Sequence, residues 1–300
     1  VTVTDGAGPT ATQTPVALVV DEADLAAGTT HGGANGGDPD TVAVNTGGLV
    51  FTAGSDAIAD VHFAAGQPAI QISGLDEAVA AQISWSGQGT DTLTGTINNV
   101  AVIRLDLTGT QTAAVGGQAT PTVTATLLAP FPHQDNPDAD ALTIKGIRVE
   151  AVDSDGTVSA PAATVEVTVL DDQPQANAGA ALSVVETAGE TAGANLLAND
   201  VKGADGATLT GVDFNDGAGP HAIAAAGVTT LTTANGVYAF QADGTWTFDP
   251  SPNLANNGAG VDAGFTYTIT DGDGDTSTAA QAVTVTDGAG PTATQTPVAL

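Results

Sequence analysis

The sequence predicts an all-β protein in which tandem β-sandwich domains form an extended rod. Three observations predict this fold class. Apolar and polar residues alternate over several stretches, turn-forming residues separate these stretches, and one long segment is repeated without change. Hydrophobic residues make up 42% of the chain, which is more than a disordered acidic chain contains, so we expect folded domains.

Four stretches carry the clearest strand signal. They are rich in Val, Ile and Thr with a period of two, and Gly, Asn, Asp and Pro punctuate the chain between them. No segment shows a sustained and capped helical period. We therefore expect strands over 101–107, 121–127, 142–152 and 265–270.

The repeat sets the organisation of the chain. The eighteen residues VTVTDGAGPTATQTPVAL at 1–18 recur at 283–300, an offset of 283 − 1 = 282 residues. Solenoid repeats have periods of about 20–50 residues, so a period this long indicates a repeating unit of one or more whole domains. We expect near-identical tandem copies, of which this chain holds one full repeat and the start of the next.

A weaker repeat divides that unit in two. VEAVDSDGTVSAPAATVEVTVLDD at 149–172 and FTYTITDGDGDTSTAAQAVTVTD at 265–287 each predict a closing β-hairpin with an acidic, Gly-containing turn. A Pro-containing linker follows each hairpin, and then a short apolar strand that ends in Glu22 or Glu186. The predicted boundaries are 1–15 for the end of the preceding repeat and linker, 16–171 for a larger sandwich, 172–287 for a smaller sandwich, and 288–300 for the start of the next repeat.

Charge and cysteine content point to a divalent cation. The chain has 34 acidic and 4 basic residues, a formal charge of −30, and no cysteine. Such a charge repels nucleic acid and anionic membrane surfaces and attracts cations. Small secreted domains commonly rely on disulfides for stability, so a secreted chain without them needs another stabilising cross-link. Ca²⁺, which takes oxygen ligands, is the candidate cofactor.

The sharpest local motif is Asp271-Gly272-Asp273-Gly274-Asp275. Three carboxylates within five residues are typical of a hard-cation site, and glycine lets such a turn close tightly. The twelfth position of an EF-hand loop would be Ala282 rather than Glu, so an EF-hand is not expected. The alternative is a solvated hairpin turn. Asp153-Ser154-Asp155-Gly156 is a thinner version of the same motif.

Sandwich topology predicts which acids meet. The closing turn of a domain should face back to the linker before that domain, and the end of its first strand should face the linker after it. The expected Ca²⁺ ligands at the complete junction are Glu22, Asp171, Asp172, Asp271, Asp273 and Asp275. By the same reasoning Glu186 and Asp287 face the next repeat, and Asp5, Asp153 and Asp155 lie near the junction that enters residue 16.

Other polar and aromatic residues carry weaker signals. Asp135, Asp138 and Asp140 are interpreted as a solvated loop cluster, and Asp205, Asp213 and Asp216 as loop residues. His31, His62, His133 and His221 have no spacing typical of a zinc site or a catalytic triad. Trp85, Trp246 and Tyr267 lie in strand-like contexts, so we expect them in the core.

Several segments resemble known families. LLANDV at 196–201, YAFQADGTWTFDPSPN at 238–253 and FTYTITDGDGDTSTA at 265–279 resemble the VCBS and cadherin-like Ig modules of giant bacterial surface proteins. VVDEADLAAGT at 19–29, LVFTAGSDAIADVHF at 49–63 and the hairpin at 149–172 resemble the larger repeat of type I-secreted RTX adhesins.

The resemblance implies tandem Ig-like or cadherin-like sandwiches in the extender of an extracellular, cell-anchored adhesin that serves adhesion and biofilm formation. It also implies Ca²⁺ at the linkers and supports Glu22, Asp171, Asp172, Glu186, Asp271, Asp273, Asp275 and Asp287 as ligands. The turn at Asp153 and Asp155 lacks the third Asp of the fuller pattern, so a weaker site is expected there.

Four functional hypotheses follow. The favoured one is a spacer, monomeric, whose partners are neighbouring repeats of the same chain, with no nucleic-acid partner and no membrane insertion. The alternative is a module that binds glycan or protein through a loop of the first domain. An enzyme is disfavoured because no nucleophile, base or metal constellation is visible. Homophilic association, as in cadherins, has no self-complementary patch to support it.

Overall fold

The computed structural model describes residues 6–25, 44–74, 82–133, 141–255, 258 and 260–288. The chain forms two compact units, and each is described by itself. The first unit contains Val1–Gln173 together with two short later segments, Gly203–Gly206 and Gly272–Asp275. The second unit contains Pro174–Lys202, Ala207–Asp271 and Thr276–Leu300.

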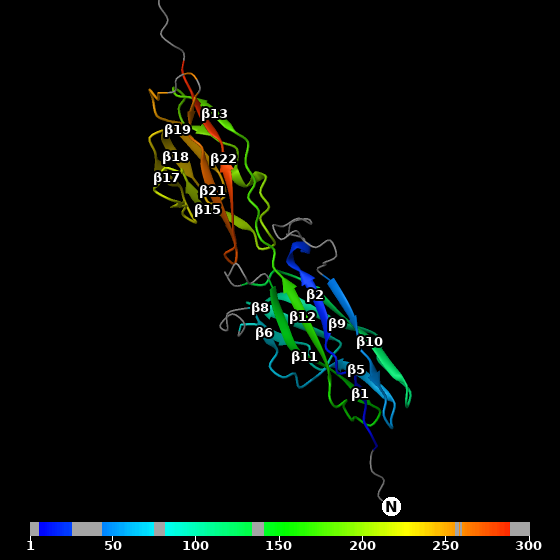
Figure 1. Ribbon diagram of the computed structural model, residues 1–300. Helices are drawn as coiled ribbons and strands as arrows, with labels where there is room; N and C mark the ends of the chain where they lie inside the picture. Colours follow the sequence, from blue (N-terminus) through cyan, green and yellow to red (C-terminus); the bar gives the residue numbers. More distant parts are fainter. Residues whose placement is uncertain are drawn as a thin grey trace, which may run out of the picture. The chain divides into compact units, whose positions relative to one another are not determined.

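The regular structure of both units is β (Figure 1). The described residues contain no α-helix and only two short 3₁₀ turns, η1 (Glu22–Asp24) and η2 (Leu196–Ala198). The predicted all-β fold class is thus confirmed. None of the helices among the described residues is long and apolar enough to cross a membrane.

The first unit consists of two sheets. In the larger sheet, the strands run in the order β1 (Thr10–Ala11), β4 (Phe51–Thr52), β10 (Gln118–Leu127), β9 (Val100–Thr110), β8 (Thr92–Ile97) and β7 (Ser84–Ser86), with β3 (Val44–Gly48) also paired to β10. In the other sheet, the order is β2 (Val16–Asp21), β12 (Ala163–Leu170), β11 (Ala141–Asp153) and β5 (Ile58–Phe63), with β6 (Gln71–Ser73) also paired to β11.

In this unit, apolar side chains reach the core because buried residues alternate with less buried ones along the strands. Strand β12 has a strictly alternating burial pattern, so that Val165, Val167 and Val169 are fully buried while the residues between them are only partly so. In β-strands, successive side chains point to opposite faces of the sheet, so these valines pack inward together with Leu18 and Val20 of β2. The hydrophobic pattern read from the sequence is therefore the pattern that the sandwich buries.

Strand β2 pairs with β12 in parallel, and this pairing positions the acidic residues. The register aligns Val16 with Val165 and Asp21 with Leu170. Both strands therefore end at the same edge of the sheet. The next residues along the two strands are Glu22 and Asp171, so an acid follows each of the two paired strands at the same end of the sheet.

The second unit consists of three sheets. The first is β13 (Leu182–Val185), β23 (Val283–Thr286) and β20 (Val261–Asp262). The second is β14 (Thr191–Ala192), β19 (Trp246–Pro250), β18 (Gly236–Phe240) and β17 (Thr229–Thr232). The third is β16 (His221–Ala222), β15 (Ala207–Asp213), β21 (Phe265–Asp271) and β22 (Thr276–Gln281).

The second unit has a separate core that is rich in aromatic rings. Tyr238, Phe240, Trp246 and Phe265 pack with ring centroids 5.2–6.2 Å apart, mostly edge to face or stacked. Trp246 and Tyr267 are buried, as expected from the sequence, and the partly buried Trp85 packs on the core of the first unit. Strand β13 pairs with β23 in parallel and repeats the arrangement of β2 and β12.

Candidate metal centre

The centre starts from the two acids at the parallel strand ends of the first unit. The side chain of Glu22 is 2% exposed and that of Asp171 is 7% exposed. Glu22 opens the turn η1, where the side chain of Asp21 accepts a hydrogen bond from the Ala23 N–H at 2.9 Å. This cap ends the strand sharply and leaves the carboxyl of Glu22 at the sheet edge.

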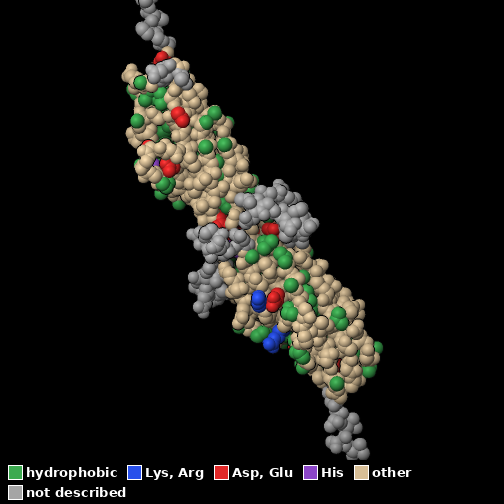
Figure 2. Space-filling model, in the orientation of Figure 1, with side chains coloured by type: hydrophobic (Ala, Val, Ile, Leu, Met, Phe, Trp, Pro, Cys, Tyr) green, Lys and Arg blue, Asp and Glu red, His purple; other side chains and the backbone are tan. Residues whose placement is uncertain are grey.

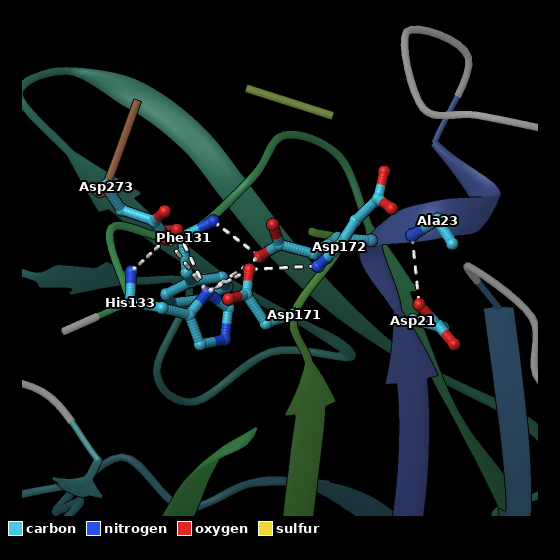
Figure 3. A network of polar contacts seen from close by, with 8 residues as sticks. Asp21, Ala23, Phe131, His133, Asp171, Asp172 and Asp273 are labelled. Carbon is cyan, nitrogen blue, oxygen red and sulfur yellow. Dashed lines mark hydrogen bonds and ion pairs between the residues drawn. The ribbon is translucent and has the colours of Figure 1, made fainter. Parts of the chain in front are cut away.

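A loop after β10 covers these two acids. The N–H of Phe131 donates to Glu22 Oε1 at 2.7 Å, and His133 Nδ1 lies 3.2 Å from the Phe131 carbonyl oxygen. The imidazole is fully buried. Its Nδ1 lies 3.3 Å from Asp171 Oδ1 and 3.6 Å from Glu22 Oε1, as Figure 3 shows for the histidine and its acidic neighbours.

The segment 272–275 contributes further carboxylates to the same unit. The backbone N–H of His133 donates to Asp273 Oδ2 at 3.1 Å, and the side chain of Asp273 is 6% exposed (Figure 3). Asp275 hydrogen-bonds to Asp171 through its side chain. A Cβ at position 272 would lie 2.5 Å from Asp205 Oδ2, so glycine at 272 is what allows Asp205 to approach this turn.

The donor atoms are close enough to share an ion. One ligand atom from each of Glu22, His133 and Asp171 lies within 4.8 Å of the others, and the same holds for Asp171, Asp273 and Asp275. Carboxylate oxygens crowded in this way suit a hard divalent cation such as Ca²⁺, which takes six to eight oxygen ligands at about 2.3–2.6 Å. The residues present therefore fit a Ca²⁺ site, with His133 as the one nitrogen donor in these two groups.

Burial makes the charged forms of these acids costly. Burial raises the pKa of Glu22 from 4.5 to about 10, and the carboxylate of Asp171 adds to this effect. Burial also raises the pKa of Asp171, as do the neighbouring Asp273 and Asp275. Two carboxyls can share a hydrogen bond only if one of them is protonated, which explains the contribution of Asp275.

Burial also shifts the pKa values of Asp205 and His133. The pKa of Asp205 is raised to about 6, mainly by burial and then by the charge of Asp273. Burial lowers the pKa of His133, which favours the neutral imidazole. Among the ion pairs that the described cluster residues make with one another, His133 is the one basic partner. The carboxyls thus need protons or a cation to be stable in this environment.

Two of the predicted ligands, Asp153 and Asp155, do not join this cluster. Asp172 is buried beside it and its N–H donates to Asp171 Oδ1 at 2.9 Å. Asp271 ends β21 in the second unit. Asp153 and Asp155 instead accept from the Thr157 N–H, at 2.7 and 3.4 Å. Their carboxylates therefore close their own turn.

The remaining predicted ligands follow β13 and β23 in the second unit or lie outside the described residues. Glu186 Oε2 accepts from the Leu254 N–H at 3.0 Å, and Asp287 is exposed. Asp5 lies outside the described residues, as do the loop acids Asp135, Asp138 and Asp140. All of these assignments as metal ligands remain predictions.

Sequence reasoning did not select His133 or Asp205. His133 has no metal-ligand spacing to any other residue, because its neighbours come from positions 22, 171 and 273. Asp205 was interpreted as a loop residue, and it does lie in a loop, where it is half-buried against Gly272. Its one sequence signal is the Gly-Ala-Asp-Gly context, which is typical of a tight turn.

The visible surface differs from the cluster. Figure 2 shows that backbone and uncharged polar groups make up most of the face in view, with acidic side chains in small separate patches. An isolated surface carboxylate is well hydrated and needs no counter-ion. The buried carboxyls of the candidate centre are for that reason the ones that point to a bound cation.

Residues 171–284 match the family described as Bacterial Ig domain. No curated protein matches the chain. The second sandwich is thus an Ig-like module of a kind that is typically structural, and no enzyme family is indicated. The fold class of the chain is Ig-like or cadherin-like β-sandwich, as the sequence predicted.

Solved structures with a detectable likeness include cadherin ectodomains. Mouse protocadherin gamma C3 EC1–3 has a TM-score of 0.30 and 15% identity, with 94% of this chain and 69% of that chain covered. Mouse cadherin-23 EC22–24 has a TM-score of 0.29 and 16% identity, covering 94% and 100%. Drosophila N-cadherin EC1–4 has a TM-score of 0.27 and 12% identity, covering 94% and 50%, so this chain spans half of that protein. TM-scores this low carry no functional conclusion.

Proposed function

We propose that the chain is a structural extender of a bacterial surface adhesin, in which Ca²⁺ at the linkers between domains makes the rod rigid. In this proposal the rod projects the ligand-binding domains of a type I-secreted, RTX-type adhesin for adhesion and biofilm formation. The observation that carries the proposal is the gathering of the carboxyls Glu22, Asp171, Asp273 and Asp275 in the first unit, where the side chains of Glu22, Asp171 and Asp273 are only 2%, 7% and 6% exposed.

The proposed ion would act through the connectivity of the chain. Asp273 and Asp275 belong to the first unit, yet the residues that flank them, Asp271 and Thr276, belong to β21 and β22 of the second. An ion held by Asp171 and Asp273 would therefore tie the end of β12 to the β21–β22 turn. Ca²⁺ suits this role because it accepts many oxygens and varied geometry.

Neighbouring backbone N–H groups would orient the ligands of such an ion. The Phe131 N–H holds Glu22 Oε1 in place, and the His133 N–H holds Asp273 Oδ2. Groups that fix the orientation of the residues that bind a metal commonly determine how well the metal binds. His133 would stay neutral, since its pKa is lowered by burial.

The rest of the proposal is supported by composition and repetition. An identical eighteen-residue segment at each end of a 300-residue chain favours a rod with uniform links over a binding module, because a rod needs many similar copies. The absence of cysteine and the charge of −30 favour a cation as the staple in an extracellular setting. The expected partners are neighbouring repeats, and the expected state is monomeric.

Calorimetry of the 300-residue chain tests the proposed ion. A ligand that binds only the folded state at about 100 times its Kd adds about 2.7 kcal/mol, which corresponds to a rise in Tm of about 2–4 °C per kcal/mol for chains of this size. We expect Ca²⁺ to raise the Tm well above its value in excess chelator, and Mg²⁺ to raise it less because Mg²⁺ demands octahedral geometry. An unchanged Tm would refute the proposed Ca²⁺ site.

Small-angle scattering tests the proposed rod. With Ca²⁺ we expect one fixed maximum dimension that is larger than that of a compact globule of the same mass. With chelator we expect a broader distribution of dimensions, because a linker without the ion is free to bend. A maximum dimension near that of a globule, or one that Ca²⁺ leaves unchanged, would count against the spacer. Sedimentation with Ca²⁺ tests the monomeric state.

A further inference from the structure

We propose that the second unit binds one neutral sugar residue of a glycan in the pocket between Phe214, Asp262 and Gln281. The pocket has a volume of about 700 Å³, within the range of about 300–1,000 Å³ of small-molecule sites. All of its lining residues belong to the second unit. The proposed binding is independent of the Ca²⁺ centre and adds a ligand to a module described so far as a spacer.

The apolar wall of the pocket is aromatic. Phe214, Tyr238 and Phe265 all line it. Phe214 is half-buried, with its ring centroid 4.8 Å from that of Tyr238 and 6.1 Å from that of Phe265. Contacts of this kind fix the ring in place, so little conformational entropy is lost when a ligand packs against it. A sugar presents C–H groups on one face, which suits such a wall.

The polar wall offers acceptors that are held in fixed positions. Gln281 is 2% exposed, and its Nε2 donates to the carbonyl oxygens of Ala180 and Ala282 at 2.8 and 2.9 Å. With both N–H groups directed at backbone, the amide oxygen Oε1 is the atom that remains to accept from a ligand. A Cβ at position 179 would lie 2.5 Å from this oxygen, so Gly179 keeps the space beside it open.

The rim adds more acceptors of the same kind. Asp262 accepts from the Gly264 N–H through Oδ1 at 2.9 Å, and Asp216 accepts from the Ala218 N–H through Oδ1 at 2.9 Å. Each of these bonds fixes a carboxylate and leaves its second oxygen to accept from another donor. A ligand rich in hydroxyl donors matches this wall of acceptors.

Charge selects the class of sugar. Two carboxylates on the rim and a formal charge of −30 on the chain repel anionic sugars. An organic cation would satisfy the carboxylates, but it would not use the buried amide oxygen together with the aromatic wall as fully as a polyhydroxyl ring does. A neutral hexose therefore fits both walls best.

Nuclear magnetic resonance of the 300-residue chain tests this proposal directly. The probes are D-glucose, D-galactose and D-mannose, with D-glucuronate and butylamine as the anionic and cationic comparisons. We expect at least one hexose to shift the side-chain amide signals of Gln281 and the backbone amide signals of Gly179 and Gly264. Glucuronate and butylamine should cause smaller shifts at the same concentration. The shifts should be the same in Ca²⁺ and in chelator.

Two variants locate the binding. Phe214→Leu keeps an apolar side chain but removes the aromatic face, and should weaken the hexose by about 2- to 12-fold, the value expected for losing one aromatic contact. Ala234→Tyr places a bulky side chain on the pocket lining and should abolish binding. Ala226→Tyr is the matched control, because Ala226 is exposed in the same unit and does not line the pocket.

The outcomes are decisive in either direction. Hexose-induced shifts at Gln281 that Ala234→Tyr removes and Ala226→Tyr retains would support the sugar site. No shift with any hexose, shifts that both Tyr variants retain, or tighter binding of butylamine or glucuronate would overturn it. Each variant is first checked for an unchanged Tm, and a Phe214→Leu chain that does not fold leaves the Ala234→Tyr comparison to decide.

Discussion

The two units carry a pair of acids at the same place, directly after their parallel strands, and among the described residues only the pair of the first unit is covered by further acids. In the first unit Glu22 and Asp171 follow the parallel strands β2 and β12, and in the second Glu186 and Asp287 follow the parallel strands β13 and β23. The register pairs Asp21 with Leu170 in one case and Val185 with Thr286 in the other. Both pairs of acids therefore arise from one rule of topology.

The glutamates of the two pairs are also held alike. Glu22 accepts a backbone N–H from Phe131 at 2.7 Å, and Glu186 accepts one from Leu254 at 3.0 Å. In each case the donor comes from a loop that follows later in the same domain. The glutamate position is therefore built into each sandwich by itself and does not need a neighbour.

The difference lies in what surrounds the pair. Glu22 and Asp171 are almost fully buried and have Asp273 and Asp275 beside them in the first unit, whereas Glu186 is half-buried and Asp287 is exposed. A carboxylate pair in water costs little, but carboxyls that are crowded together with little exposure to water repel one another strongly. Covering the pair with a further acidic turn is thus what converts a strand end into a candidate cation site.

The largest expected effect is the pH dependence of stability in chelator. Burial raises the pKa of Glu22 from 4.5 to about 10, so between these values the folded state binds more protons than the unfolded chain. The free energy of unfolding should therefore fall as pH rises through this window, by about 1.4 kcal/mol per pH unit for each such proton. Urea unfolding at a series of pH values measures the slope.

Saturating Ca²⁺ is the control for this slope. A bound cation replaces the protons, so the stability should become nearly independent of pH between neutral and mildly alkaline conditions. A slope that is absent in chelator, or equal with and without Ca²⁺, would contradict the assignment of Glu22 and Asp171 as the buried titrating groups.

A matched pair of substitutions gives the next largest effect. Glu22→Gln keeps an acceptor oxygen for the Phe131 N–H but removes a charge, so it should abolish most of the stabilisation by Ca²⁺, about 2–3 kcal/mol. Glu186→Gln makes the same change at the uncovered position and should alter stability by less than about 0.5 kcal/mol. Calorimetry with and without Ca²⁺ measures both.

The same two variants distinguish a loss of Ca²⁺ binding from a loss of packing. In chelator Glu22→Gln should be neutral or stabilising at alkaline pH, because it removes a buried carboxyl that resists ionisation. If Glu22→Gln lowered the Tm equally in Ca²⁺ and chelator, the glutamate would be a structural residue. If Glu186→Gln lost as much Ca²⁺ response as Glu22→Gln, burial would not be the distinguishing factor.

Much of the fold was predictable because the alternation of apolar and polar residues that indicates a strand is a local property of the sequence. The alternation at 142–152 and 265–270 predicts β11 (Ala141–Asp153) and β21 (Phe265–Asp271) to within two residues. The acidic strand ends were also predictable, since repeated hairpins and repeated first strands imply repeated edges. These signals depend on residues that are close together in the sequence, so they can be recognised before the fold is known.

The rest of the candidate centre depends on contacts between distant residues. In the sequence His133 lies 133 − 22 = 111 positions from Glu22, 171 − 133 = 38 from Asp171 and 273 − 133 = 140 from Asp273. Only the path of the loop after β10 brings it there. Nothing in a single sequence reports such a path when the ligand has no fixed spacing.

The two acidic turns show the same limit from the other side. Asp153-Ser154-Asp155-Gly156 resembles Asp271-Gly272-Asp273-Gly274-Asp275 in sequence. In the first turn Asp155 accepts from both the N–H and the hydroxyl of Thr157, at 3.4 and 3.2 Å. A carboxylate that accepts hydrogen bonds within its own turn is less available to a ligand. Whether it does so depends on the residue two positions later, here Thr157. The number of aspartates alone does not distinguish the two turns.

The smallest expected effect comes from a matched change in these turns. Asp273→Asn keeps an oxygen that accepts the His133 N–H, now at 3.1 Å from Asp273 Oδ2, but removes a charge from the proposed ligand set. We expect it to weaken Ca²⁺ about tenfold, or about 1.4 kcal/mol. Asp155→Asn also keeps an acceptor, for Thr157, and should leave Ca²⁺ affinity unchanged. Titration calorimetry measures both affinities. Asp155 already accepts hydrogen bonds within its own turn, so its replacement should not affect Ca²⁺. If both variants lost Ca²⁺ affinity equally, Ca²⁺ would bind Asp-Gly turns in general. The covering of Glu22 and Asp171 would then not be what creates the site.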